Sequence, residues 1–443
     1  MTTALGSNAE RTELRRRRIL VISQTFVPDP ASVGQHMTDV AKELARRGYE
    51  VRVYTSARGY ENPRAKYPRR EFMGAGGGGG VDIRRLPLAS FGKKRLWARV
   101  FGTASFQVQA LWHMLWTRRV AGIFFATSPP LVGVMACVAQ ALRGMPIVYW
   151  AMDLNPDQLI ALGRLKEKSL AARLLEGANR LILRRSALIV ALDRFMQGRL
   201  LARGDFGDKM VVMPPWPHEE SMAAADSAAD AGAAANPFRE KHGLGGKRVI
   251  MYSGNHSPAN PLSTLLEAAA GFKDDDRVRF VFVGGGAGKQ EVEACIREHQ
   301  LTNMLSLPYQ PLAELRYSLS AADVHVVSMG QEMAGIIHPC KIYGAMTVGR
   351  PVLYLGPKPS HISDILEAHQ CGWQVAHGDV EGMKRRIEAI LAAPAADLRR
   401  MGSAGQAAVR GSLSQEILQG RMGDELERVF NRPRREAGRE NLP

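Results

Sequence analysis

Short apolar runs alternate with amphipathic segments along most of this chain. The runs are rich in Val, Ile, Leu and Phe and predict buried strands at residues 18–23, 49–55, 122–127, 146–150, 187–192, 210–213, 248–253, 279–283, 324–328 and 352–355. The segments between them have the apolar spacing of helices, the first over residues 36–47. Strands that alternate with helices are typical of parallel sheets covered on both faces, so the sequence predicts an α/β protein.

The pattern divides into two halves. Residues 221–245 are rich in Ala, Asp and Ser and have no strand pattern, so this segment is the predicted interdomain linker. A chain of 443 residues with 45% hydrophobic content can bury two cores. We therefore predict two domains at 18–220 and 246–394, C-terminal helices at 395–430, a disordered basic segment at 1–17 and a tail at 431–443.

Cysteine spacing and hydropathy indicate a protein of a reducing compartment. The four cysteines, Cys137, Cys295, Cys340 and Cys371, lack the spacing of disulfides or metal ligands. The apolar run after the N-terminal arginines is too short for a signal peptide, and no apolar run reaches the length of about eighteen residues that predicts a transmembrane helix. We expect a cytoplasmic protein.

Basic residues concentrate in a span without acids. The net charge is +16, and residues 83–152 contain nine Lys and Arg but no Asp or Glu. An apolar stripe at helical spacing runs through this span and consists of Trp97, Phe101, Ala104, Val108, Leu111 and Leu115. A basic helix rich in tryptophan can bind an anionic membrane surface. The candidate membrane contacts are Lys93, Lys94, Arg95, Trp97, Arg99 and Phe101. The alternative is that the stripe packs on the protein's own core.

The segment 338–353 reads as a polar loop, a short helix and a buried strand in succession. Pro339 suits the first turn of a helix, whose free N–H groups attract an anion, and Lys341 adds a full charge. Gly349 and Pro351 end the helix before the strand. The segment therefore predicts a phosphate site, although an ordinary helix-to-strand turn with a surface lysine has the same pattern.

Two glycine-rich loops follow strands in the same half. They are Gly254-Asn255-His256 and Gly284-Gly285-Gly286. Backbone N–H groups in such loops can approach a pyrophosphate closely, and open parallel sheets bind ligands at this edge. Each loop alone is more often a tight turn, so their value as a prediction lies in their occurring together with Lys341.

The segment after residue 338 resembles the retaining glycosyltransferases of family 4. Their run Met-Ala-x-Gly-x-Pro-Val is matched by residues 346–352, with Thr347 in place of alanine, and the Pro-Ser-Lys-x-Tyr element of one subgroup is matched by residues 339–343, with Cys340 in place of serine. The resemblance implies the GT-B fold: α/β, with two Rossmann-like domains whose parallel sheets face across a cleft. It also implies a final helix that returns to the N-terminal half.

The resemblance assigns the C-terminal half to a nucleoside-diphosphate sugar, expected to be UDP-linked, with no metal and no further cofactor. Lys341 would stabilise the leaving diphosphate. The other donor-binding candidates are Gly254, Asn255, His256, Gly284, Gly285, Tyr309, His338, Pro339, Cys340, Ile342 and Tyr343.

The resemblance assigns the N-terminal half to the acceptor, expected to be a lipid-linked saccharide. Gly34, Gln35 and His36 open the first helix, where relatives have a loop close to both sugars. Asp153 is the candidate catalytic polar group, with Asn155 beside it at the acceptor. The alternative for Asp153 is a helix N-cap.

Much of this family has two glutamates with seven residues between them, and this chain departs from that pattern. Ile336 and Gly344 occupy those positions, and Glu332 could substitute only if the loop is longer than usual. The donor sugar, the linkage and the oligomeric state stay open.

The expected function is retaining sugar transfer in polysaccharide or surface-glycan synthesis, by a protein bound peripherally to the inner face of the cytoplasmic membrane. The alternatives are a nucleotide-sugar epimerase of the same fold and a non-catalytic membrane partner. A nicotinamide oxidoreductase is not favoured, because no Gly-x-Gly-x-x-Gly follows the first strand. Nucleic acid is not expected as a partner, because no recognised module is present.

Overall fold

The computed structural model describes residues 18–29, 31–59, 65–75, 79–87, 96–217 and 236–432. The chain divides into two compact units. The N-terminal unit extends to Ile160, resumes at Leu165–Pro214 and includes the chain from Leu418 onward, whereas the C-terminal unit comprises Ala161–Arg164 and Pro215–Ile417. The segment predicted at 1–17, and the tail predicted at 431–443 except for its first two residues, lie outside the described residues.

The N-terminal unit contains an eight-stranded sheet. Its strands are β1 (Arg18–Ile22), β2 (Glu50–Ser56), β3 (Arg70–Gly74), β4 (Gly80–Leu86), β5 (Val120–Ala126), β6 (Ile147–Trp150), β7 (Leu188–Ala191) and β8 (Met210–Val212). They lie in the order β3-β4-β2-β1-β5-β6-β7-β8, and only the β3–β4 pair is antiparallel. All seven residues of β5 are buried, as expected for a strand covered on both faces.

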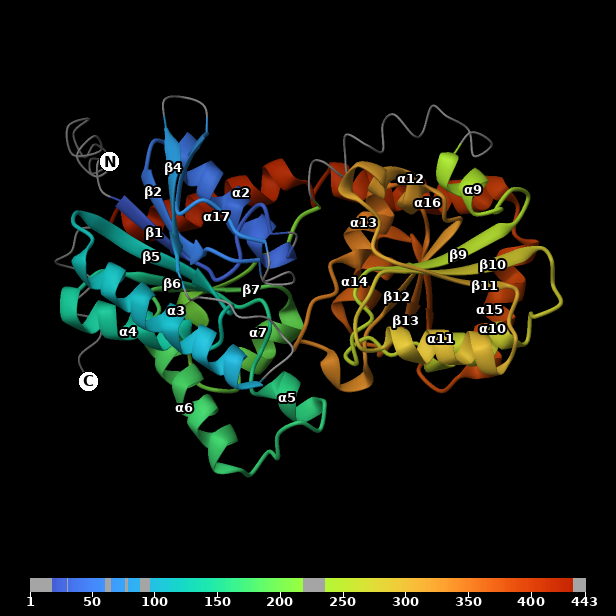
Figure 1. Ribbon diagram of the computed structural model, residues 1–443, viewed down its shortest axis with the longest axis horizontal. Helices are drawn as coiled ribbons and strands as arrows, with labels where there is room; N and C mark the ends of the chain where they lie inside the picture. Colours follow the sequence, from blue (N-terminus) through green and yellow to red (C-terminus); the bar gives the residue numbers. More distant parts are fainter. Residues whose placement is uncertain are drawn as a thin grey trace, which may run out of the picture. The chain divides into compact units, whose positions relative to one another are not determined.

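Helices cover both faces of this sheet. They are α2 (Ser32–Arg46), α3 (Leu96–Trp116), α4 (Val132–Arg143), α5 (Asp157–Ala161), α6 (Leu170–Arg185), α7 (Arg194–Leu201) and α17 (Gln415–Phe430), with a 3₁₀ turn at Gly207–Lys209. Figure 1 shows α2 and α17 along one face and α3, α4 and α6 along the other.

The final helix, α17, is anchored in the N-terminal unit. Arg47 at the end of α2 donates to the carboxylates of Asp424 and Glu427, both at 2.7 Å. The ring of Phe430 lies against Gly122, where a Cβ atom would be 2.3 Å from it, so only glycine fits at that point of β5. The C-terminal segment therefore completes the N-terminal unit.

The C-terminal unit contains a six-stranded parallel sheet. Its strands are β9 (Arg248–Ser253), β10 (Val278–Val283), β11 (Met304–Leu307), β12 (Val324–Ser328), β13 (Val352–Leu355) and β14 (Gly372–Val375). The order β11-β10-β9-β12-β13-β14 is the Rossmann order, and the direction of connection reverses between β9 and β12. In sheets of this order, ligands commonly bind at the carboxyl edge beside the point where the connection reverses.

The helices of this unit are α9 (Pro237–Lys241), α10 (Ser263–Ala270), α11 (Lys289–Glu298), α12 (Leu315–Ser320), α13 (Lys341–Thr347), α14 (His361–His369), α15 (Val380–Ala392) and α16 (Ala395–Arg410), with 3₁₀ turns η3 (Leu312–Glu314) and η4 (Gln331–Met333). Part of the predicted linker folds here. Phe238 of α9 is 3% exposed and packs in a core cluster with Leu244 and Val249. Residues 236–245 therefore belong to the C-terminal unit.

Among the described residues, no helix combines the length and the hydropathy needed to cross a bilayer.

Candidate active site

The predicted phosphate site lies at the point of the C-terminal sheet where the connection reverses. Gly254 directly follows β9, Gly284 directly follows β10, and the loop after β12 leads to Lys341 at the start of α13. The helix begins at Lys341 and is seven residues long, so Pro339 lies in the loop before it and not in its first turn. The side chain of Lys341, together with the glycine loops, therefore defines the site.

The ammonium group of Lys341 is enclosed by neutral groups. Its Nζ donates to the Tyr252 hydroxyl at 2.5 Å and to the Asn255 carbonyl oxygen at 3.0 Å. The charge also lies 4.5 Å from the centroid of the Tyr252 ring. No carboxylate pairs with it among the described residues, and burial lowers the pKa of Lys341 to about 7. A bound anion would restore the lost stabilisation of this charge.

The two glycine loops pack directly on each other and on Lys341. Gly254 has φ +132°, and a Cβ atom there would be 2.5 Å from Lys341 Cε. Gly284 has φ +133°, and its Cβ would be 2.0 Å from the Gly254 carbonyl oxygen. Both positions require glycine for conformation and for space. Gly285 lies against the Tyr309 ring, which would be 3.0 Å from an added Cβ.

His256 lies between the two loops as a neutral imidazole. It is 1% exposed, and within the described part of the chain neither ring nitrogen has a hydrogen-bond partner. Burial, together with the charges of Lys341 and Lys289, lowers the pKa of His256 to about 4. Its backbone N–H donates to the Gly285 carbonyl oxygen at 2.7 Å, which joins the loops.

Two residues of this site were not predicted from the sequence. Lys289, the first residue of α11, donates through Nζ to the carbonyl oxygens of Gly284 at 2.7 Å and Leu307 at 2.6 Å. Tyr252 lies in a strand and reads there as an ordinary core residue. Lys289 had a signal, because it follows the glycine run at the start of a predicted helix.

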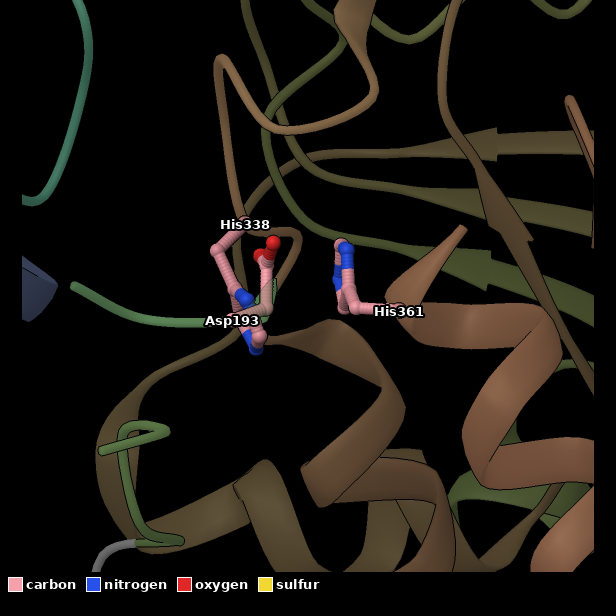
Figure 2. Close-up of side chains that lie close together, drawn as sticks. All are labelled: Asp193, His338 and His361. Atoms are coloured by element: carbon pink, nitrogen blue, oxygen red, sulfur yellow. The ribbon is translucent and has the colours of Figure 1, made fainter. Parts of the chain in front are cut away.

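The loop before α13 is held by buried aromatic contacts. His338 Nε2 lies 2.8 Å from the Tyr343 hydroxyl, and its ring stacks on His361 with centroids 3.8 Å apart (Figure 2). Cys340 Sγ donates to the His338 carbonyl oxygen at 3.4 Å. Ile342 and Tyr343 are buried in the first turn of α13, directly after this loop. His361, at the start of α14, was not identified from the sequence.

The positions of the two family glutamates have no acid in this fold. Ile336 is buried and apolar, and Gly344 lies in the middle of α13. Glu332 is exposed on the turn η4, eight residues before Cys340 in the chain.

Asp153 and Asn155 follow β6 and line one pocket in the N-terminal unit. Burial raises the pKa of the Asp153 carboxyl to about 6. The N-cap interpretation is not supported, because the carboxylate accepts no hydrogen bond from any described backbone group. Its own backbone N–H donates to Thr127 Oγ1 at 3.3 Å. The side chain of Asn179, on α6, donates to the Asn155 carbonyl oxygen.

The other acceptor candidates lie in the first turns of α2, which begins four residues earlier than predicted. An added Cβ at Gly34 would be 3.1 Å from the backbone N of Phe26, so this turn packs closely on the preceding loop. His36 is buried, and its Nδ1 donates to the Ser32 carbonyl oxygen at 2.8 Å. Gln35 is partly exposed. His36 therefore orients the turn, and Gln35 is the more accessible side chain.

Helix α3 carries two apolar faces. Phe106, Ala110 and Met114 are fully buried, whereas Phe101 is 54% and Val108 is 67% exposed. The interpretation of the predicted stripe as core is therefore wrong for Phe101 and Val108. The rings of Trp112 and Trp116 stack with their centroids 4.1 Å apart. Both are exposed and extend the exposed apolar face of α3. Lys93, Lys94 and Arg95 lie outside the described residues, as do the side chains of Trp97 and Arg99.

Two family models match the chain in succession. The Glycosyl transferase 4-like domain matches residues 32–216, and Glycosyl transferases group 1 matches residues 235–408. Together they account for most of the chain. The protein belongs to the glycosyltransferases of GT-B fold and has a family 4-like N-terminal domain.

Relatives and solved structures agree with this assignment. The chain is 25% identical over 404 residues to the probable glycosyltransferase WbjE of Pseudomonas aeruginosa, covering 90% of this chain and 95% of the relative. It is 26% identical over 354 residues to the putative colanic acid biosynthesis glycosyl transferase WcaI of Escherichia coli (strain K12), covering 75% and 81%.

Sucrose-phosphate synthase from Thermosynechococcus elongatus has a similar structure, with a TM-score of 0.71 at 17% identity over 94% of this chain and 99% of that one. Anabaena HepE in complex with UDP and glucose has a TM-score of 0.66 at 16% identity over 93% and 100%. These likenesses confirm the predicted GT-B fold.

Proposed function

We propose that this glycosyltransferase moves a sugar, with retention of configuration, from a UDP-sugar to a lipid-linked saccharide during polysaccharide or surface-glycan synthesis. The observation that carries the proposal is the enclosed ammonium group of Lys341, which has no carboxylate partner among the described residues and lies against two glycine loops. A diphosphate supplies the charge that this group lacks.

In the proposed reaction Lys341 acts on the leaving group. The bond between the anomeric carbon and the diphosphate oxygen breaks, and its electron pair stays on that oxygen, beside the Lys341 charge. The acceptor hydroxyl forms the new bond from the same face and gives its proton to the leaving diphosphate. Tyr309, which is half exposed beside Gly285, would stack on the base of the nucleotide. No metal is required, because the Lys341 charge stabilises the leaving diphosphate.

Names of related proteins support the substrate class. Structures of HepE are described in complex with UDP and with UDP-glucose. WaaG, whose structure has a TM-score of 0.63 with this chain at 15% identity, is described as a glycosyltransferase involved in lipopolysaccharide biosynthesis. These descriptions support a nucleotide-sugar donor and a surface-glycan product here.

Thermal shift with a panel of nucleoside diphosphates and sugar nucleotides tests the donor site. UDP should raise the melting temperature in the presence of EDTA, and Lys341→Ala should remove most of the shift. Lys384→Ala, which removes a partly exposed lysine of α15, is the matched control and should keep it. A shift that needs manganese and survives Lys341→Ala would show that the phosphate assignment is wrong.

We further propose that the protein binds the inner face of the cytoplasmic membrane peripherally through α3 and the basic residues before it. The exposed Phe101, Val108, Trp112 and Trp116 can enter the interface, and each nearby basic residue adds about 1 kcal/mol at an acidic surface. Arg118 and Arg119, exposed at the end of α3, have the same sign of charge. The apolar face and the positive charge therefore favour the same partner.

Vesicle sedimentation tests this second proposal. Wild-type protein should bind anionic vesicles at low salt and less at high salt. Glutamine at Lys93, Lys94, Arg95 and Arg99 should release it, as should Trp112→Ser with Trp116→Ser. Glutamine at four basic residues of α15 and α16, Lys384, Arg385, Arg399 and Arg400, should not. Equal binding by all variants, or no binding by the wild type, would contradict the proposal.

A further inference from the structure

The N-terminal unit contains a pocket with one polar and one apolar side. It encloses about 430 Å³, including its open mouth, at the carboxyl ends of β5 and β6. The polar side consists of Thr127, Asp153, Asn155 and Asn179. The apolar side consists of Phe125, Leu131, Val132, Leu175 and Ile182.

The polar side has capacity for a hydrogen-bonding ligand. The Asp153 carboxylate has no hydrogen-bond or ion-pair partner among the described side chains. Desolvation without a partner is unfavourable, so a donor from a ligand would stabilise this group. None of the residues that line the pocket is basic. A phosphate or nucleotide therefore has no counter-charge here, whereas a sugar hydroxyl or an amide N–H fits the polar groups.

The apolar side of the pocket is closely packed. Val132 and Ile182 are buried, and a Cβ atom at Gly133 would be 2.7 Å from Ile182 Cδ1 and 2.8 Å from the Phe125 ring. Leu131 lies at the mouth of the pocket, and its backbone has the left-handed conformation, with φ +66°. Such a conformation is unfavourable for a leucine and is kept only where the surroundings impose it.

We infer that this pocket selects an acceptor whose terminal sugar carries a methyl-bearing substituent, either an N-acetyl group or a 6-deoxy carbon. The inference rests on the proposed function and adds a substrate class to it. The methyl group packs against Val132 and Leu175, and neighbouring hydroxyl or amide groups bond Asp153 and Asn155. A plain hexose would instead place a hydroxyl against the apolar side, where it finds no partner.

Saturation-transfer NMR on the full chain tests the inference with three soluble probes. They are the methyl β-glycosides of glucose, N-acetylglucosamine and 6-deoxyglucose. One of the two substituted sugars should bind at least about fourfold more tightly than the glucoside, the effect of burying one methyl group. Its substituent methyl should also receive the strongest saturation. The sugar that binds tells the N-acetyl source from the 6-deoxy source.

Matched variants locate the preference on the pocket. Val132→Thr places a hydroxyl in the apolar side and should reduce the ratio of affinities, substituted sugar over glucoside, to near one. Val138→Thr, on the exposed side of the same helix, should leave this ratio unchanged. Leu175→Ser should act like Val132→Thr, with the adjacent exposed Leu174→Ser as its control. Thermal melts show whether each variant folds, and the second pair serves if Val132→Thr does not.

Separate readouts distinguish this inference from the proposed function. The UDP-induced thermal shift reports on the C-terminal unit and should be unchanged in all four variants. Loss of that shift in the wild type would contradict the proposed donor but not the sugar preference. Equal or tighter binding of the glucoside, binding of none of the three sugars, or a preference that persists in both Val132→Thr and Leu175→Ser would overturn the inference.

Discussion

Replacing Lys341 with methionine should stabilise the unliganded protein while removing its affinity for UDP. The substitution keeps a long unbranched side chain but removes a charge that the fold encloses without a carboxylate partner among the described residues. The Tyr252 hydroxyl still donates to the Asn255 carbonyl oxygen at 2.7 Å, so no buried hydroxyl loses its only partner. The charge is therefore kept for binding, at the expense of stability.

The magnitude follows from the pKa of Lys341. Lowering this pKa from 10.5 to about 7 corresponds to a cost on the order of 5 kcal/mol for holding the proton in the folded state. The hydrogen bonds of the ammonium group are already part of this shift, and Lys341 as a whole is only partly buried, so solvent screening reduces the cost that is realised. The variant should therefore gain about 2 kcal/mol in free energy of unfolding near pH 6.

The gain should depend on pH in a defined direction. Between pH 7 and pH 10.5 the wild-type lysine is neutral when folded and protonated when unfolded, so rising pH stabilises the wild type and not the variant. The difference in unfolding free energy should shrink through this window and vanish above it. Urea denaturation at pH 6, 8 and 10 measures it, with Lys384→Met as the surface control. A variant less stable than wild type at every pH, or a pH-independent difference, would refute the reasoning.

Three further predictions concern the same two units. UDP affinity measured by calorimetry should fall on the order of tenfold from pH 6.5 to pH 8.5, because the unliganded Lys341 loses its proton near pH 7; a constant affinity would contradict this. Gly284→Ala, which forces a Cβ to within 2.0 Å of the Gly254 carbonyl oxygen, should weaken UDP binding at least about tenfold; unchanged affinity would show that the loops do not form the site. Arg47→Ala should lower the free energy of unfolding by about 1–3 kcal/mol in urea denaturation, because it leaves the buried Glu43 with one fewer partner and frees α17; Arg47→Lys should recover part of the loss, and full stability of the alanine variant would contradict the anchoring role.

Most of the fold was accessible from the sequence because parallel strands covered on both faces appear as continuous apolar runs. The strand β3 was missed for the opposite reason. It is an exposed edge strand with Arg70 and Glu71 at its start, so it has no apolar run. Periodicity also predicted α3 but not the face that packs. Both Phe101 and Phe106 belong to apolar stripes, and only the fold decides that Phe106 is buried.

The candidate site was predictable where the signal is local. Lys341 and the glycines lie in short motifs whose chemistry follows from residue type and order. Tyr252 could not be found, because its role arises from a contact with Lys341, 89 residues away in the sequence. His361 could not be found, because its role arises from stacking on His338. The apolar side of the N-terminal pocket is likewise assembled from β5, α4 and α6, which are separate in sequence.

The most direct test of the proposed function is transfer from a UDP-sugar to a lipid-linked saccharide, followed by NMR of the product in the presence of EDTA. The wild type should release UDP much faster with the acceptor than without it, and the new linkage should have the anomeric configuration of the donor. Lys341→Ala should abolish transfer. Conversion of one sugar nucleotide into another without an acceptor would support an epimerase, and an inverted linkage would contradict the proposed mechanism.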